Sequence, residues 1–401
     1  MKRTVAEPVG WIRLGTIAAA VAIMVSACSS TTTNPGSTSK QPPTAGIKPP
    51  TSIGAPEGQL NLIAWGGYVD ASWATPFTQL TNCKITEKDA GSSDEMVSLM
   101  ANGGGGQWDM VSASGDADLR LIYGGDVQPM NTDLIPDWQT FQPQFKSPAF
   151  NTINGIHYGI SLQWGPNTLL YNTDKFPVAP TSWSVIYDPQ YKKLITIPDN
   201  PIQIADAALY LSKTQPKFGI TDPYELTQTQ FDAAVNLLKT QAPLVKAYWA
   251  AVGDEETLFK SGDALVGAAW PIMTSDLKKA GAHTADTIPS EGATGWVDTW
   301  MLAAKAPHPN CAYLWTKYVS TAHVQAQQAL SYGETPVNTK ACAEMDALGG
   351  GGSCSAFHGD APGSYFDNIK FWKTPIADCG NGSTNCKAYA DWQAAWTAIK
   401  G

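Results

Sequence analysis

Tryptophan and carboxylate side chains stand together where short apolar runs of the sequence end. Trp65 and Trp270 each end such a run, and the chain has 15 tryptophans in all. Trp296 stands two positions before Asp298. The face of an aromatic ring attracts an organic cation, and a carboxylate adds a charge-assisted hydrogen bond to an ammonium group. The pattern therefore predicts a binding site for a small organic cation.

A scaffold of alternating strands and helices has to position these residues. Apolar runs indicate strands at 60–65, 84–88, 110–112, 168–171, 264–270 and 300–303. Amphipathic spacing indicates helices at 71–80, 94–102 and 231–238, and Pro309 opens another helix with Asn310 as its N-cap. Alternating elements over this length predict an α/β protein with mainly parallel sheets. In such proteins the ligand lies at the carboxyl ends of the strands.

The N-terminal segment has the features of an exported lipoprotein. Basic residues precede an apolar run at 14–27, which is typical of a secretory signal peptide and too short to span a membrane. The run ends in Val25-Ser-Ala-Cys28, which resembles the lipobox of bacterial lipoproteins. We therefore expect a signal peptide at 1–27 and a lipid on Cys28. Residues 28–58 are rich in Ser, Thr, Pro and Gly, so we expect a disordered tether there.

Length and charge limit what the remaining chain can be. From about residue 59 to residue 401 it is too long for one compact core, which predicts two lobes. The formal net charge of the whole chain is −9. An acidic protein of this kind is a poor partner for nucleic acid, and we expect none.

The seven cysteines divide into one for the lipid and six for disulfides. An even number of remaining cysteines in an exported protein predicts three disulfides, although sequence alone leaves their connectivity open. Cys379 and Cys386 flank a Gly-Asn-Gly turn, and Cys342 and Cys354 flank a run of glycines. The favoured set is Cys342–Cys354, Cys379–Cys386 and, from the two that remain, Cys83–Cys311.

The sequence carries no complete enzyme signature. It has no His-Glu-x-x-His and no Gly-x-x-x-x-Gly-Lys-Ser/Thr motif, and its five histidines have no metal-ligand spacing. Gly352-Ser-Cys354-Ser-Ala approaches the Gly-x-Cys-x-Gly elbow of polyester synthases, but the last glycine is missing and no apolar strand precedes it. We therefore expect no catalytic residue, no metal and no cofactor.

Several ordered segments resemble the spermidine/putrescine-binding proteins of ABC transporters. They are 60–68, 109–116, 158–172, 267–270, 296–298 and Thr335-Pro-Val-Asn338. Longer stretches, together with the six cysteines, resemble a polyamine-binding branch that is sometimes also labelled polyhydroxybutyrate synthase. Those stretches are 91–96, 112–122, 129–136, 163–174, 206–211 and 287–298. The resemblance covers nearly all of the chain from about residue 59 to residue 401.

The resemblance implies a two-lobed fold of the type II periplasmic-binding-protein kind, with the ligand in the cleft. Lobe one would hold 59–165 and 295–338, and lobe two would hold 166–294 and 339–401. Cys83 and Cys311 would then share lobe one, and the other four cysteines would share lobe two. No disulfide would bridge the lobes, which a clamshell that opens and closes requires.

The resemblance also carries individual ligand-site residues over to this chain. Trp65, Tyr68, Trp270 and Trp296 match aromatic walls, Ser114 matches a polar contact, and Asp298 matches the carboxylate that binds an amine. Where the family has Thr-Glu after the first tryptophan, this chain has Gly66-Gly67. Asn200 and Gln203 stand where the family has an acidic pair, with Asp199 beside them. Asp116 stands where the family often has Tyr, and Glu334 stands near another family Tyr. The expected ligand-binding set is Trp65, Tyr68, Ser114, Asp116, Trp164, Asp199, Trp270, Trp296, Asp298 and Glu334.

Together these features predict an exported, lipid-anchored, monomeric solute-binding protein that delivers a small polyamine to its cognate ABC permease. The membrane would be contacted through the lipid alone. One alternative of the same class is a binder of another small organic cation, such as an opine-like or amino-acid-derived amine. A different class is a polyester-synthase-like enzyme, which would need an unpaired cysteine. A purely structural envelope lipoprotein would not need tryptophans and carboxylates at strand ends.

Overall fold

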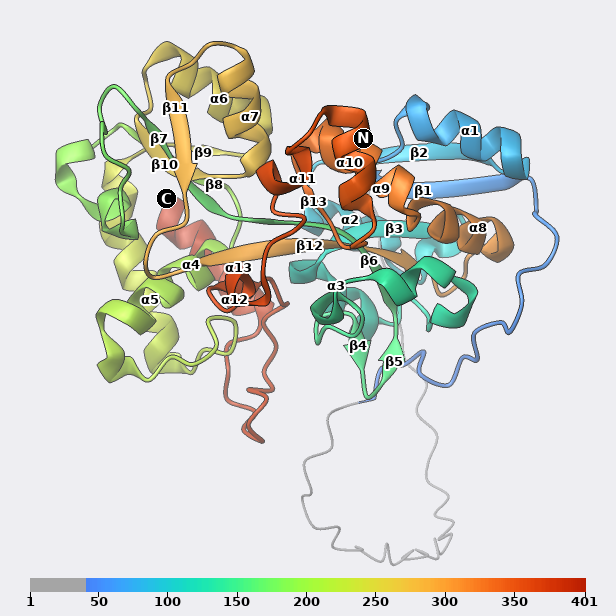
Figure 1. Ribbon diagram of the computed structural model, residues 1–401. Helices are drawn as coiled ribbons and strands as arrows, with labels where there is room; N and C mark the ends of the chain where they lie inside the picture. Colours follow the sequence, from blue (N-terminus) through green and yellow to red (C-terminus); the bar gives the residue numbers. More distant parts are fainter. Residues whose placement is uncertain (1–40) are drawn as a thin grey trace, which may run out of the picture. The chain divides into compact units, whose positions relative to one another are not determined.

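The computed structural model describes residues 41–401, and Figure 1 shows its helices and strands coloured along the sequence. The expected signal peptide at 1–27, the lipidated Cys28 and the first part of the tether lie outside the described residues. The described chain alternates strands and helices, so the α/β prediction is confirmed. Within 41–401, no helix has both the length and the apolar character that a membrane crossing requires.

The larger sheet is organised around one long strand. Its order is β13 (Thr335–Pro336), β6 (Gly159–Pro166), β12 (Ala293–Leu302), β3 (Met110–Ser114), β1 (Gln59–Trp65) and β2 (Lys84–Ala90), and β14 (Ile369–Phe371) also pairs with β12. All residues of β12 are buried, because this strand pairs with β14, β6 and β3 along its length. β12 is therefore a rigid support for the side chains that it carries.

The smaller sheet has the order β11 (Thr284–Thr287), β7 (Thr168–Asn172), β10 (Val266–Ala269), β8 (Ile195–Pro198) and β9 (Val245–Trp249). Every residue of β8 and β10 is buried, as continuous apolar runs in the middle of a covered sheet should be. A separate hairpin joins β4 (Thr152–Ile153) to β5 (Ile156–His157).

Both large sheets are mixed, which corrects the expectation of mainly parallel sheets. In the larger sheet β1 runs parallel to β2 and β3, but β12 runs antiparallel to β3 and β6. In the smaller sheet β8 runs parallel to β9 and β10, but β7 runs antiparallel to β10 and β11. The alternating pattern missed this because β6 and β7 follow each other directly in the chain but join different sheets, where β6 pairs with β12 and β7 lies between β10 and β11.

Helices surround the sheets and close their cores. They are α1 (Ala71–Thr81), α2 (Ser93–Met100), α3 (Gly115–Gly124), α4 (Gln203–Thr214), α5 (Gln228–Gln241), α6 (Val252–Ser261), α7 (Pro271–Lys279), α8 (Pro309–Val319), α9 (Ala322–Tyr332), α10 (Ala341–Gly349), α11 (Ser353–Ala356), α12 (Gly363–Phe366) and α13 (Tyr389–Lys400). The apolar stripe of α5, from Phe231 to Leu238, packs into the core of the smaller sheet, as its spacing predicts. Figure 1 shows α4, α5 and α13 beside that sheet and α8 beside β1.

The segment 339–371 does not follow the lobe expected for it. We expected residues 339–401 to belong to lobe two. Instead β14 pairs with β12 of the larger sheet, and Ala341 and Met345 of α10 pack on Ala326 and Ala329 of α9. Only the last part of the segment joins the smaller sheet, where Trp392 and Trp396 of α13 enter its core. The chain therefore returns to the larger sheet before it reaches α13.

The end of the tether packs against the folded chain, which corrects the expectation of disorder up to residue 58. Thr44 is buried and its hydroxyl donates to the Val127 carbonyl at 2.7 Å. Glu57 accepts hydrogen bonds from the backbone N–H groups of Asn310 and Cys311, at 3.0 and 2.9 Å. These are first-turn donors of α8, so Glu57, from outside the helix, takes the role that we expected Asn310 to play as the N-cap.

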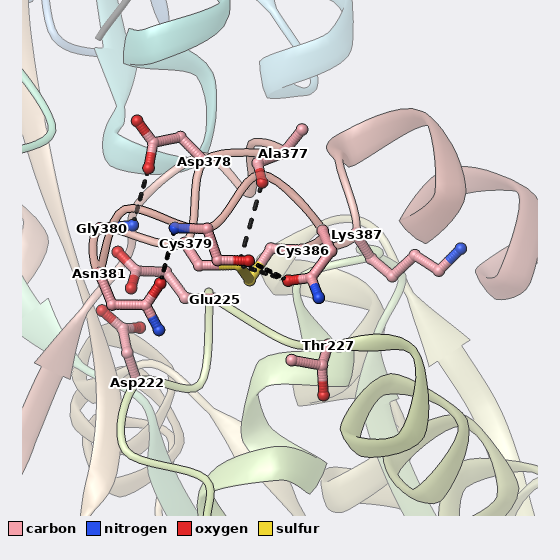
Figure 2. Close-up of a disulfide and its surroundings, with 12 residues drawn as sticks. Asp222, Glu225, Thr227, Ala377, Asp378, Cys379, Gly380, Asn381, Cys386 and Lys387 are labelled. Carbon is pink, nitrogen blue, oxygen red and sulfur yellow. Dashed lines mark hydrogen bonds between the residues drawn. A yellow bond between two sulfur atoms is a disulfide. The ribbon is translucent and has the colours of Figure 1, made fainter. Parts of the chain in front are cut away.

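The structure joins the six cysteines of the described chain as Cys83–Cys311, Cys342–Cys354 and Cys379–Cys386. These are the three pairs that the sequence favours. Figure 2 shows the third of them closing a short loop beside Asp222 and Glu225. Backbone contacts attach this loop to the turn before α5, since Cys386 forms an isolated antiparallel β-bridge with Thr227. It therefore fixes the path of the chain into α13.

Candidate ligand-binding site

A pocket of about 460 Å³ lies where strand ends of the two sheets meet. The larger sheet contributes Trp65 at the end of β1, Ser114 at the end of β3 and part of β12. The smaller sheet contributes the residues that follow β8, β9 and β10. The pocket is therefore at the carboxyl ends of strands, the position at which open α/β sheets bind their ligands. Its volume suits a small molecule.

Two carboxylates, one buried and one half-buried, share one tyrosine hydroxyl on the larger-sheet side of the pocket. The Tyr68 hydroxyl donates to Asp298 Oδ2, and it lies 3.1 Å from each carboxylate oxygen of Glu334. The Ser114 hydroxyl donates to Asp298 Oδ1. Asp298 is only 3% exposed. Both acids are thus oriented by protein donors, yet no Lys, Arg or His within 41–401 forms an ion pair with either of them.

Burial makes this acid pair hold protons at unusually high pH. Desolvation raises the pKa of Asp298 to about 7, although hydrogen bonds from Ser114 and Tyr68 act in the opposite direction. Desolvation also raises the pKa of Glu334 well above its usual value, and the charge of Asp298 raises it further. Two close carboxylates cannot both ionise cheaply in an apolar pocket. A cationic group placed between them would supply the missing positive charge.

Aromatic rings form the walls around the acid pair. Trp296 comes from the same strand as Asp298, and Trp65 from the end of β1. On the smaller-sheet side, Trp270 and Trp249 meet edge to face with their ring centroids 4.9 Å apart. The Trp270 indole is held by its N–H, which donates to Asn167 Oδ1 at 3.1 Å. The walls offer several ring faces to a cation.

Two glycines make room for these rings. A Cβ atom on Gly165 would lie 2.5 Å from Cζ2 of Trp296, so the indole occupies the space of a side chain. Gly67 has φ +92°, and a Cβ there would collide with the Tyr332 hydroxyl. Gly67 thus permits Tyr332 to approach Tyr68, with ring centroids 5.3 Å apart.

Asp199 lines the pocket from the smaller-sheet side, but its charge is already paired. Lys400 Nζ lies 2.6 and 2.8 Å from its two carboxylate oxygens. The Trp396 indole N–H donates to Oδ1 at 2.8 Å. Asp199 therefore differs from Asp298 and Glu334, which have no basic partner within the described chain.

Two expected site residues do not line the pocket. Trp164 is fully buried behind the larger sheet, where it packs on Phe145, Phe366 and Phe371. Asp116 is also fully buried, and it accepts hydrogen bonds from Ser93 at 2.9 Å and from Asn200 at 3.5 Å. Because Ser93 and Asn200 line the pocket, Asp116 supports the site indirectly, through its hydrogen bonds to these two residues.

The other eight expected residues line the same pocket: Trp65, Tyr68, Ser114, Asp199, Trp270, Trp296, Asp298 and Glu334. Sequence reasoning missed Trp249, Tyr332 and Trp372, which also line it. Trp249 ends β9, so the rule that picked out Trp65 at the end of its apolar run could have found it. Tyr332 ends α9 and Trp372 follows β14, and neither position carries a comparable signal.

Within 41–401, no group of three His, Cys, Asp or Glu side chains is placed to hold a metal ion. The pocket presents two neighbouring acids, Asp298 and Glu334, with the Tyr68 hydroxyl between them, and several aromatic faces. This arrangement can bind an ammonium group and shield it from water.

Comparison with known proteins agrees with the fold. A sequence profile of the bacterial extracellular solute-binding proteins matches residues 72–347. The spermidine/putrescine-binding periplasmic protein of Escherichia coli K12 is 24% identical over 283 residues, which are 70% of this chain and 78% of that protein. The putrescine/cadaverine-binding protein of Pseudomonas aeruginosa is 24% identical over 274 residues, 64% of this chain and 72% of that protein.

A solved structure shows the same architecture. The spermidine/putrescine ABC transporter substrate-binding protein PotD of Streptococcus pneumoniae superposes with a TM-score of 0.66 at 18% identity, covering 86% of this chain and 99% of that one. The fold is the type II periplasmic-binding-protein fold. Since the family profile spans more than half of the sequence, the chain belongs to the bacterial extracellular solute-binding proteins.

Proposed function

We propose that this protein binds a small polyamine, such as putrescine or spermidine, outside the cytoplasm and delivers it to an ABC importer. The observation that carries the proposal is the Asp298–Glu334 pair, a buried acid beside a half-buried one in an aromatic pocket with no basic partner within 41–401. Relatives named for spermidine, putrescine and cadaverine binding support the same ligand class.

The acid pair supplies the charge and the rings supply the shape. An ammonium about 4 Å from a carboxylate at an effective dielectric near 20 is attracted by roughly 4 kcal/mol before its desolvation is subtracted. Each aromatic face adds about 0.5–2 kcal/mol. Because the pKa of Asp298 is about 7, the arriving cation displaces a proton from the pair near neutral pH. Binding is then an exchange of a proton for an ammonium group.

The lobes and the anchor belong to the same proposal. One lobe would form around each sheet, with 339–371 moving with the larger sheet because of its contacts there. The two would close over the bound cation. Cys28 would carry the lipid that keeps the monomeric protein near its permease on the outer face of the membrane.

The protein would act without catalysis. The enzymatic alternative required Cys354 as a nucleophile. Cys354 is bonded to Cys342 in the structure, so its sulfur has no free thiolate to attack a substrate. This supports a binding protein over a polyester synthase.

A second candidate ligand is another small organic cation with one ammonium group, such as an amino-acid-derived amine. The observation that favours it is the ion pair between Asp199 and Lys400, which leaves the smaller-sheet side of the pocket without a free acid. Both candidates predict the same contact at Asp298 and Glu334.

A thermal-shift screen followed by titration calorimetry tests the proposal. Putrescine, spermidine, an amino-acid-derived amine, a sugar and an anion would be compared on the purified mature protein. A ligand at a hundredfold excess over its dissociation constant stabilises the protein by about 2.7 kcal/mol. We expect amines to raise the unfolding midpoint. If the sugar or the anion alone raises it, the cation proposal is wrong.

A further inference from the structure

The pocket contains acids on two sides, and the protein itself neutralises one of them. Asp298 and Glu334 stand on the larger-sheet side. Asp199, directly after β8, stands on the smaller-sheet side of the same pocket. A ligand with two ammonium groups would find a carboxylate at each side if all three acids were free.

Lys400 takes the place that a second ammonium group would need. Its Nζ bonds both oxygens of Asp199, at 2.6 and 2.8 Å, as a primary ammonium of a ligand would do. The Trp396 indole N–H donates to the same carboxylate, and the Lys400 ammonium lies 6.0 Å from the centre of the Trp396 ring. An ammonium, a carboxylate and a tryptophan thus form a complete cation site whose occupant is part of the protein.

Lys400 is positioned for this role by α13. The helix buries Trp392 and Trp396 in the core of the smaller sheet, which fixes its last turn beside the strand end that carries Asp199. The side chains of Lys400 and Asp199 are each about one third exposed, at 32% and 31%. The pair is therefore accessible enough to open, unlike a fully buried ion pair.

We propose that Lys400 is a specificity-determining residue, an internal counter-ion that holds Asp199 and sets how the pocket treats the second charge of a ligand. The inference rests on the proposed function. One ammonium group binds at Asp298 and Glu334. A second ammonium group has to displace Lys400 from Asp199, so a diamine gains little over a monoamine of equal length.

Calorimetry with putrescine and 1-aminobutane on wild type and Lys400→Met tests this directly. The two amines share a four-carbon chain and differ in the second charge. With Lys400 removed, Asp199 becomes free, and the ratio of putrescine affinity to 1-aminobutane affinity should rise about tenfold or more. Lys387→Met is the matched control, because Lys387 lies near Lys400 in the chain but pairs with Asp391, which does not line the pocket, and not with Asp199. The ratio of putrescine affinity to 1-aminobutane affinity in Lys387→Met should equal that of wild type.

A second variant tests the same proposal in case Lys400→Met fails to fold. Lys400→Gln keeps a hydrogen-bond donor for Asp199 and removes the charge, and it should raise the ratio in the same direction. If both amines bind wild type and neither Lys400 variant changes the ratio by more than about twofold, the role of Lys400 is overturned. If neither amine binds wild type or the Lys400 variants, the proposed function itself is wrong and the inference falls with it.

Discussion

The hydroxyl of Tyr68 donates to the carboxylate of Asp298, and this contact joins residues 230 positions apart in the sequence. It brings the turn after β1 to the middle of β12, so the acid is held before any ligand arrives. The same hydroxyl is within reach of Glu334. One phenolic proton cannot be donated to two ionised acids at once, and the pair therefore retains a proton until a cation replaces it.

Asp298→Asn should remove most of the affinity for amines. The change keeps the shape of the side chain and deletes the charge. Removing one partner of a buried, hydrogen-bonded charge pair costs about 2–5 kcal/mol, which is a loss of roughly thirtyfold to several thousandfold. Titration calorimetry with putrescine measures it, and the unfolding midpoint of the ligand-free variant should not fall.

Asp206→Asn is the matched control for that experiment. Asp206 is another acid whose pKa burial raises to about 7, and its carboxylate accepts from Thr294, but it does not line the cation pocket. It should bind amines as wild type does. Equal affinity of wild type and the Asp298 variant would show that Asp298 is not the amine contact.

Affinity and stability should depend on pH in opposite ways. The folded protein holds the Asp298 proton up to a pKa of about 7, whereas the unfolded chain releases it near 3.8. This proton stabilises the folded state fully below about pH 4, and the contribution is lost as the pH rises towards about 7. Over the same window amine affinity should increase, by up to about tenfold per pH unit for each proton exchanged.

Calorimetry in buffers of different ionisation enthalpy would detect the proton released on binding. Thermal unfolding of ligand-free wild type and Asp298→Asn at several pH values would test the effect on stability. The free energy of unfolding should depend less steeply on pH in the variant. A binding reaction without proton release near pH 6, or an unchanged slope, would contradict the assignment.

Gly165→Ala should weaken binding although the residue itself is absent from the pocket lining. The new Cβ would displace the Trp296 indole, because the two would be 2.5 Å apart. The expected loss is about 0.5–2 kcal/mol, the value of one aromatic face. Gly363→Ala is the control, since nothing lies within 4 Å of the position its Cβ would take. Direct removal of the ring by Trp296→Leu should give a loss of similar size.

The cysteines of the folded, mature protein should be unreactive until they are reduced. Iodoacetamide should add no mass without a reductant and should modify six cysteines of the described chain after reduction and unfolding. Among these, opening Cys83–Cys311, whose residues are 228 positions apart, should destabilise the protein most, by about 3–5 kcal/mol. Alkylation of non-reduced protein would disprove the three-disulfide arrangement.

Cys28→Ser should move the protein from the membrane fraction to the soluble exported fraction. The variant should keep the unfolding midpoint and the ligand affinity of wild type, because the residues that line the pocket all lie between Trp65 and Trp372. Fractionation with an antibody against the folded part measures the change. Retention of the variant in washed membranes would argue against a lipid on Cys28.

The parts of the site that the sequence revealed are those that depend on local pattern. Trp65 and Trp270 stand where apolar runs end, and strand ends meet at the ligand in this class of fold. Asp298 was placed by its resemblance to the family. Trp164 was misplaced because β6 is buried at every position, so no alternation of polar and apolar residues tells one face of the strand from the other.

Long-range pairing explains the rest of what was missed. No local pattern shows that Lys400 meets Asp199, which lies 201 positions earlier. Likewise, composition suggested a disordered tether up to residue 58, whereas Glu57 caps α8 through two backbone groups. The mixed direction of the sheets also depends on which strands become neighbours, and the order of elements along the chain does not fix that.

β12 has a consequence for anyone who would redesign the ligand range of this protein. Trp296 and Asp298 lie on a strand that is bonded along both edges, and a shift of one residue would turn every side chain to the opposite face. Random libraries there would mostly yield misfolded products. Tyr332 ends α9 and is only half-buried, so it offers a freer position. A biosensor built on this scaffold should therefore keep β12 intact and diversify the rim.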